Sequence, residues 1–140
     1  MADQTNGLGF RKLSATTMAA MYYFATLHDA GGSALSASTT DAWTGVGMAG
    51  ELSTGFGYTQ GGVALGQGSV ATNTNVDIAD AVWTASGGSI GPASYCALWC
   101  NTTNTMTGAK FIDSKDASTT PQTATDGQTM TWPQSNPIQY

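Results

Sequence analysis

The side chains that could carry acid–base catalysis are few and lie far apart in the sequence. His28 is the only histidine, so a hydrolytic triad would have to use it as the base. No serine stands in the G-x-S-x-G pattern that exposes a nucleophile on a sharp turn. A histidine at the end of a strand and beside Asp29 is more typical of a surface or interface position. The sequence therefore predicts no hydrolytic triad.

A pair of carboxylates that meet in the fold could instead act as in a glycosidase. The acidic residues lie mostly in loops or at predicted strand ends, and Asp113 and Asp116 flank Lys115 in a way typical of a solvated turn. We therefore predict that the protein is not an enzyme and has no catalytic residues.

Cys96 and Cys100 are the only cysteines, and they stand four residues apart. On one strand they would share a face at a separation of about 13 Å, which is too far for a disulfide. Two thiolates and His28 are too few ligands for a structural metal site. We expect two small buried thiols, with no metal and no cofactor.

The composition is that of a compact β protein rather than a disordered chain. A length of 140 residues fits one domain, and 41% of the residues are hydrophobic while only 9% are charged. Glycine occurs 18 times, which suits many turns. So low a charge is also compatible with life inside a large assembly, where monomers need not repel one another.

The charge balance excludes one class of partner. The net charge is −5, and the only bases are Arg11, Lys12, Lys110 and Lys115, too few to neutralise a row of phosphates. No apolar run reaches the length of a membrane-spanning helix, and the first 12 residues lack the order of a signal peptide. We expect no nucleic acid, no membrane, and folding in a cytoplasm.

The elements that would position these residues are organised around residues 76–101. Two apolar runs, 81–85 and 94–100, flank the turn sequence SGGSIGPA, which predicts a hairpin or two neighbouring strands of one sheet. Both faces of the second run are apolar, so that strand should be central and covered on both sides. Its alternating faces would hold Tyr95, Ala97 and Trp99 on one side and Cys96, Leu98 and Cys100 on the other.

Before this centre, residues 14–21 favour one or two helical turns, and residues 22–28 favour a strand that ends at the Asp-Ala-Gly-Gly turn. A single helix over residues 14–28 is the alternative. Residues 31–60 read as a long connection pinned to the sheet by spaced bulky side chains, with a possible helical turn over residues 41–48. Residues 61–65 predict a short strand.

The strand predictions then continue with a half-exposed strand over residues 70–80, a short strand over residues 109–112 and a last strand over residues 128–132. Residues 113–127 read as a long mobile loop. Pro133 and Pro137 make the tail unsuited to further pairing.

Short strands at near-regular spacing predict a mainly β fold. We expect a single antiparallel β-sandwich, jelly-roll-like, with one or two short helical turns and extended terminal arms. The expected division is an N-terminal arm over residues 1–13, the β-sandwich domain over residues 14–132 and a C-terminal tail over residues 133–140.

The four tryptophans divide by position. Trp83 and Trp99 stand inside predicted strands and should belong to the core. Trp43 and Trp132 stand near element ends and are the better candidates for exposed contacts.

Three segments in fixed order carry a resemblance to a known group of proteins. They are MYYFATLHDAG, GELSTGFGYTQGGVAL and VDIADAVWTASGGSIGPASYCALWCNTT. This order resembles small virion structural proteins of tailed bacteriophages, which combine a glycine- and tyrosine-containing element of the form GTGYT-GG-AL with a WTASGGSI turn. The matching positions are Gly55, Gly57, Tyr58, Thr59, Gly61, Gly62, Ala64, Leu65 and residues 83–90. The likeness covers about residues 21–103.

The resemblance implies a capsid decoration, or cement, protein that binds the outside of the capsid and stabilises it by bridging capsid subunits. Its partner would be the major capsid protein, it would be a homo-oligomer with a trimer preferred, and its place would be the capsid surface of the virion. The alternative is a tail- or fibre-associated structural protein or a module that binds host carbohydrate. The expected contact residues are Leu8, Phe10 and Arg11 in the arm and Trp43, Phe56 and Tyr58 in the loops.

Overall fold

The computed structural model describes residues 15–36, 40–72, 75–134 and 138–139. Within them the fold is mainly β, with one short α-helix, two 3-10 turns and antiparallel sheets, as the sequence predicts. The arm at residues 1–13 lies outside the described residues, so its predicted extended form is not tested.

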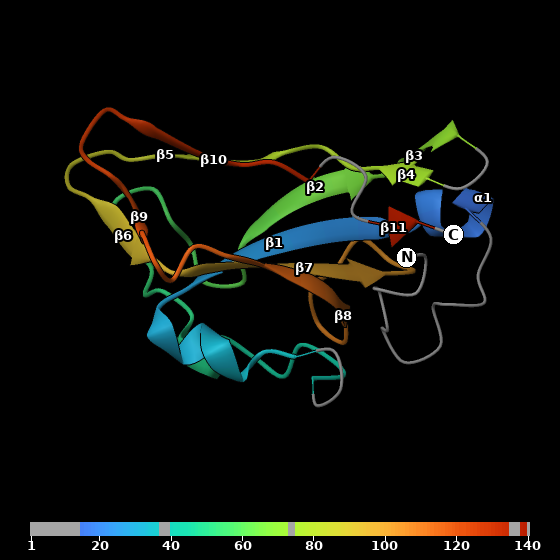
Figure 1. Cartoon of the computed structure of the whole chain (residues 1–140), viewed down its shortest axis with the longest axis horizontal. Helices are drawn as coiled ribbons and strands as arrows, with labels where there is room; N and C mark the ends of the chain where they lie inside the picture. Colours follow the sequence, from blue (N-terminus) through green and yellow to red (C-terminus); the bar gives the residue numbers. More distant parts are fainter. Residues whose placement is uncertain (1–14, 37–39, 73–74, 135–137, 140) are drawn as a thin grey trace.

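The centre of the molecule is a four-stranded antiparallel sheet in the order β2-β1-β7-β8 (Figure 1). Its strands are β1 (Tyr22–His28), β2 (Val63–Gln67), β7 (Tyr95–Asn101) and β8 (Lys110–Asp116). The aromatic run that predicts a strand over residues 22–28 forms β1 with those bounds, so the alternative long helix does not occur. The strand predicted to be central is β7, which lies between β1 and β8 and has five consecutive buried residues.

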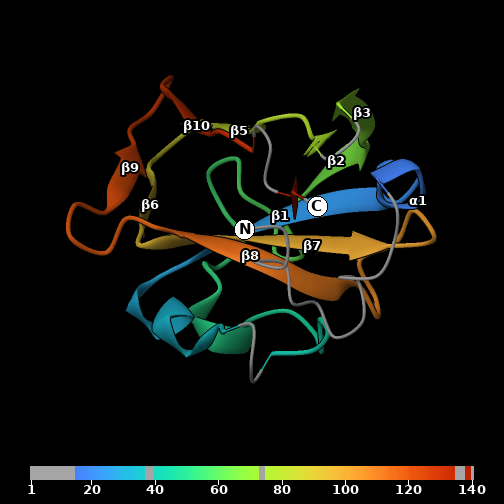
Figure 2. The ribbon, with the colours of Figure 1, turned by 45° about the vertical axis from the view of Figure 1, so that its right-hand side comes forward.

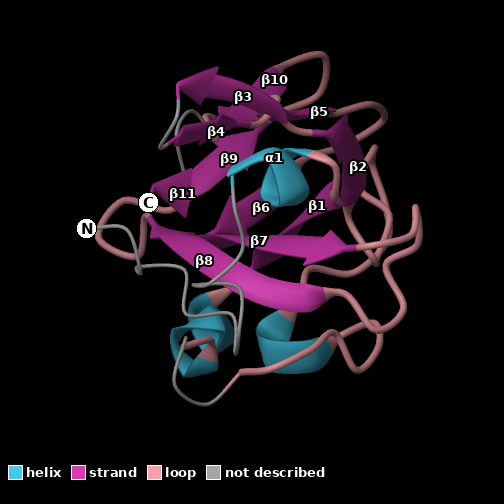
Figure 3. Cartoon of the chain, turned by 90° about the vertical axis from the view of Figure 1, so that its right-hand side faces the viewer, coloured by secondary structure: helices cyan, strands magenta, loops and turns pink. Residues whose placement is uncertain are grey.

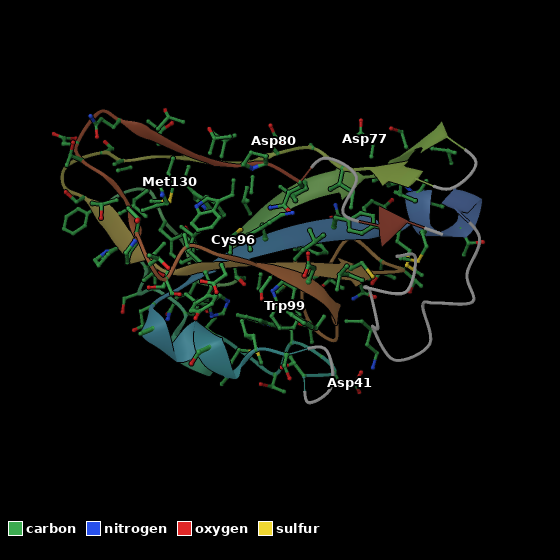
Figure 4. All side chains as sticks on the ribbon, viewed as in Figure 1. Asp41, Asp77, Asp80, Cys96, Trp99 and Met130 are labelled. Carbon is green, nitrogen blue, oxygen red and sulfur yellow. The ribbon has the colours of Figure 1, made fainter. Side chains whose placement is uncertain are left out.

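Side chains of β1 and β7 alternate between the two faces of the sheet, as the period of a strand requires. On one face Leu27 and Cys96 pack with Met130, and on the other Phe24 and Trp99 pack with Phe111. Figure 4 shows Cys96 and Met130 on one side of the sheet and Trp99 on the other. The prediction of two free, buried thiols is confirmed, because Cys96 and Cys100 are both buried and unbridged.

Three small antiparallel sheets and one helix cover the first face, which is uppermost in Figure 1. They are formed by α1 (Ala15–Ala19), β3 (Ser69–Thr72), β4 (Asn75–Asp77), β5 (Ala81–Thr84), β6 (Ile90–Ala93), β9 (Gln122–Ala124), β10 (Thr129–Trp132) and β11 (Ile138–Gln139). The pairs are β5 with β10, β6 with β9, and β4 with both β3 and β11. α1 packs against β3 and β4, as the predicted helical turns at this point of the chain allow.

The opposite face is covered by the connection between β1 and β2, which carries the two 3-10 turns η3 (Ala30–Ala34) and η4 (Met48–Gly50) (Figures 2 and 3). Leu35 and Trp43 are buried under it against Trp99, so the prediction of a pinned connection is confirmed. The helical turn expected over residues 41–48 is wrong. Asp41, the first residue of this segment, pairs instead with Lys110 on β8 at 3.1 Å.

The predicted hairpin between residues 81–85 and 94–100 is wrong. β5 pairs with β10, while β7 pairs with β1 and β8, and β6 occupies the intervening sequence. Pairing with β1 and β8 satisfies both edges of β7, so its backbone has no free edge for β5.

Three further predictions are corrected. Residues 70–80 form the two strands β3 and β4 rather than one, and β8 and β9 occupy much of the predicted loop over residues 113–127. The tail also pairs: β11 lies beside β4, and Gln134 is 1% exposed. Pro133 only separates β10 from the next pairing, since a proline removes one donor and need not end the chain's contact with the domain.

Candidate functional site

The most ordered polar cluster lies at the end of β1 and joins three side chains that the sequence scatters. Trp99 Nε1 donates to Thr26 Oγ1 at 2.8 Å, and Thr26 Oγ1 lies 2.7 Å from His28 Nε2. A carbonyl oxygen can only accept, so the neutral ring places its one hydrogen on the nitrogen that faces Ala49; Nε2 then accepts the hydroxyl hydrogen of Thr26, whose oxygen accepts from the indole. His28 then carries its hydrogen on Nδ1 and donates it to the carbonyl of Ala49 at 3.2 Å.

His28 is therefore not the surface or interface residue that the sequence suggests. Its side chain has 0% exposure, and burial lowers its pKa below the ordinary 6.5, against the opposing effects of the Ala49 carbonyl and the Glu51 charge. No described carboxylate is hydrogen-bonded to the ring, and neither His28 nor Thr26 reaches solvent. The arrangement fits a structural role for the neutral imidazole.

A second buried polar group, Glu51, holds both ends of residues 47–61. Its Oε1 accepts hydrogen bonds from the Tyr58 hydroxyl at 2.8 Å and from Gly61 N at 2.6 Å, and its Oε2 accepts one from Gly47 N at 2.8 Å. Glu51 is 6% exposed. Three donors on one carboxylate offset the cost of burying its charge, so this residue fixes the shape of the loop.

The same loop is tied to the end of β1 through the backbone. Leu52 N donates to Leu27 O, and Asp29 N donates to Gly50 O, both at 2.9 Å. Leu27 N donates to the Tyr58 hydroxyl at 3.0 Å, and burial raises the pKa of that hydroxyl above its usual value. Residues 47–61, which we call the clamped loop, are thus held by His28, Glu51 and the backbone of β1.

The clamped loop presents Phe56 at its tip. Gly55 and Tyr58 exchange two backbone hydrogen bonds, of 2.9 and 3.0 Å, around a two-residue turn in which Phe56 has φ +55° and Gly57 has φ +103°. Such turns favour asparagine and glycine, and a phenylalanine at positive φ is strained. A strained residue persists only where its surroundings impose the conformation.

Phe56 is 54% exposed, yet its ring is fixed on its inner side. A Cβ added to Gly88 would collide with three carbons of the ring, so the ring lies against the Gly88 backbone. Phe56 O also accepts a hydrogen bond from Ser86 N at 3.0 Å. The connection between β5 and β6 thus holds an exposed aromatic ring in one orientation.

A shallow hollow of about 220 Å³ lies beside this ring, lined by residues 52–56, Tyr58 and residues 89–91. Its lining contains no charged side chain. Ser53 and Ser89 are exposed, and their hydroxyls have no hydrogen-bond partner among the described residues. A surface of this kind suits contact with a neutral partner that has both apolar and polar groups.

The other predicted contact residues lie differently. Trp43 is 8% exposed and packs edge-on to Trp99 at 5.4 Å between ring centroids, and Tyr58 is 2% exposed. The expectation that Trp43 and Trp132 are exposed is wrong, since both are inserted into cores, whereas Trp83 and Trp99 are core residues as predicted. Leu8, Phe10 and Arg11 lie outside the described residues, so Phe56 is the predicted contact residue that the structure places at the surface.

The remaining candidate chemistry is dispersed. Asp113 and Asp116 lie on β8 rather than in a solvated turn, and burial raises the pKa of Asp113. Among the described residues, no group of three or more histidine, cysteine, aspartate or glutamate side chains is placed to hold a metal ion.

Glu51 and the Thr26–His28 pair, which organise the site, were missed by sequence reasoning. The Thr-x-His spacing, which puts both side chains on one strand face, was the available signal.

Comparison with known proteins gives no relative: no family model, no curated protein and no solved structure matches the chain. A search of the described residues finds no helix with the length and hydropathy needed to cross a membrane.

Proposed function

We propose that the protein is a decoration protein of a tailed-phage capsid, bound to the outside of the shell and bridging neighbouring capsid subunits as a homo-oligomer built on a sandwich-like β domain. The major capsid protein is its partner, and no catalysis is involved. Many copies of one weak contact together resist deformation of the shell.

The observation that carries the proposal is the separation of two candidate contact surfaces. α1, which follows the predicted arm, lies at one end of the molecule with β3, and the connection between β5 and β6, which holds Phe56, lies at the other (Figure 1). Val70 on β3 is 45% exposed and Phe56 is 54% exposed. A bridging protein needs two such surfaces, because each end contacts a different subunit.

The sparse charge supports the same reading. The Lys110–Asp41 pair is exposed, and most surface polarity comes from threonine, serine and glutamine side chains. Surfaces with few charges lose little solvation free energy when they are covered, so they suit repeated contacts in a crowded lattice. The resemblance of residues 21–103 to small virion structural proteins supports a viral capsid as that lattice.

The test is to locate the protein by imaging purified particles at near-atomic resolution. Regularly placed copies on the outer shell are expected, with the two ends on different subunits. A few copies confined to the tail would overturn the proposal.

Variants then test the two ends separately. Deleting residues 2–12 should leave the domain folded and weaken its attachment to particles, whereas unfolding would mean that the arm belongs to the core. Phe56→Gly should weaken attachment without loss of folding, because glycine accepts the positive φ of this position. Val82→Ala, at an exposed position on β5, is the matched control and should bind normally.

The second candidate function is a tail-associated module that binds host carbohydrate. The hollow beside Phe56 favours it, since a sugar ring can pack its C–H groups on an aromatic face while serine hydroxyls bond its hydroxyls. Binding of the isolated protein to neutral glycans on an array, lost in Phe56→Gly and Ser89→Ala but not in Val82→Ala, would support this function. Failure to bind any glycan would remove it.

A further inference from the structure

The clamped loop is held to β1 by a histidine that can act only while it is neutral. Nδ1 of His28 donates to Ala49 O, and Nε2 accepts the hydrogen of Thr26 Oγ1. Ala49 has φ +51°, a left-handed conformation that is strained for alanine. The hydrogen bond from His28 is therefore made to a residue whose backbone would be less strained in another conformation.

Adding a proton at Nε2 would break this arrangement. Thr26 Oγ1 could accept from both Trp99 Nε1 and a protonated Nε2, but a protonated Nε2 no longer accepts the hydroxyl hydrogen, which must then turn away from the ring. Thr26 and Trp99 are both 0% exposed, so no water reaches the displaced hydrogen. Protonation would bury a cation and leave one donor unsatisfied.

The surrounding groups do not cancel this cost. Glu51 and Asp29 carry the negative charges that favour the cation, and the phenol of Tyr95 comes from the opposite position on β7. Glu51 already accepts three hydrogen bonds, and Asp29 accepts one from Gly31 N. Burial is the largest effect and keeps the pKa of His28 below 6.5.

We infer that His28 makes the attachment of residues 47–61 sensitive to acid. Its protonation releases these residues from the end of β1 and so frees the loop that presents Phe56. The released loop exposes His28 to water, where it takes up a proton at about pH 6.5. Acid therefore favours the released state as the pH falls below that value, and the clamped state is fully favoured above it. This inference goes beyond the proposed function and holds whichever partner Phe56 contacts.

Hydrogen exchange of the full chain at pH 7.5 and pH 5.0, corrected for the intrinsic rates, tests the inference. Protection of the amides in residues 47–61 should fall by up to tenfold per pH unit below about 6.5, since one proton is taken up on release. Protection of β7 and β8 should change less. Unchanged protection of the loop, or an equal loss over the whole chain, would overturn the inference.

His28→Gln is the matched variant, because glutamine is neutral at every pH and still offers a donor and an acceptor. Its loop protection should not differ between the two pH values. An equal acid response in this variant would assign the effect to other groups and overturn the inference.

A second measurement keeps the inference testable should the variant fail to fold. His28 is the only histidine, so its ring signals in the NMR spectrum of the natural chain are unique. Their titration midpoint should lie below 6.5, and loop resonances should shift with the same midpoint. A midpoint at or above 6.5 would overturn the inference.

Discussion

The hydroxyl of Tyr58 donates to Glu51 Oε1 at 2.8 Å and accepts the backbone N–H of Leu27 at 3.0 Å, so one oxygen links the clamped loop to β1. Tyr58→Phe keeps the ring and removes both bonds. It should destabilise the protein by about 1–3 kcal/mol, because a buried N–H and a buried carboxylate oxygen each lose a partner. Urea denaturation measures the change.

Tyr22→Phe is the control for this experiment. Its hydroxyl has no hydrogen bond among the described residues and its side chain is partly exposed, so the same deletion should cost less than about 0.5 kcal/mol. Equal losses in the two variants would contradict the role assigned to Tyr58.

Two neighbouring glycines separate the effect of backbone strain from that of space. Gly61 and Gly62 have φ +94° and +77°, but a Cβ at Gly61 meets nothing within 4 Å whereas one at Gly62 collides with the carbonyl of Ala25. Gly61→Ala should cost about 1–2 kcal/mol from strain alone. Gly62→Ala should cost clearly more, because β1 must move. Thermal unfolding of both variants gives the comparison, and similar melting temperatures would refute it.

Burial should make both thiols unreactive in the folded state. It raises the pKa of Cys96 and of Cys100 to about 12, so almost no thiolate exists at neutral pH. An aromatic disulfide reagent should label neither residue in native protein and both in urea. Rapid labelling of one thiol without denaturant would show that its core opens locally.

Asp113 should make stability depend on pH in the direction opposite to His28. Burial raises its pKa above 3.8, so the folded state holds its proton more tightly than the unfolded chain does, and stability falls as the pH rises from about 3.8 through the higher folded value. Asp113→Asn should therefore raise the melting temperature at pH 7 and leave it nearly unchanged at pH 3. The exposed Asp126→Asn is a control for the loss of one charge.

Local signals in the sequence predict the strand at Tyr22–His28 and the buried character of Tyr95–Asn101, because aromatic alternation and the Asp-Ala-Gly-Gly turn act within a few residues. Pairing is a different problem. β5 joins β10 across more than 40 residues, and nothing near Trp83 distinguishes Met130 from Leu98 as its neighbour. The predicted hairpin is wrong because two strands close in sequence need not be neighbours in a sheet.

The candidate site divides in the same way. Phe56 could be named as a contact residue from its place in a glycine-rich loop, and it is exposed. Tyr58, two residues on, occurs in the same sequence context but is buried, because Glu51 and Leu27 satisfy its hydroxyl. Those partners depend on how the loop folds back on β1, and the hydrophobic pattern of the sequence does not predict that fold.

The pairing of β1 with β7 has a consequence for the order in which the chain can fold. Tyr22 pairs with Asn101 and His28 with Tyr95, so the middle of the central sheet closes loops of about 67 to 79 residues. Contacts of such long range slow folding, because the entropy of loop closure must be lost before they form. As the chain leaves the ribosome, β1 must wait for more than half of the sequence before its second edge is covered.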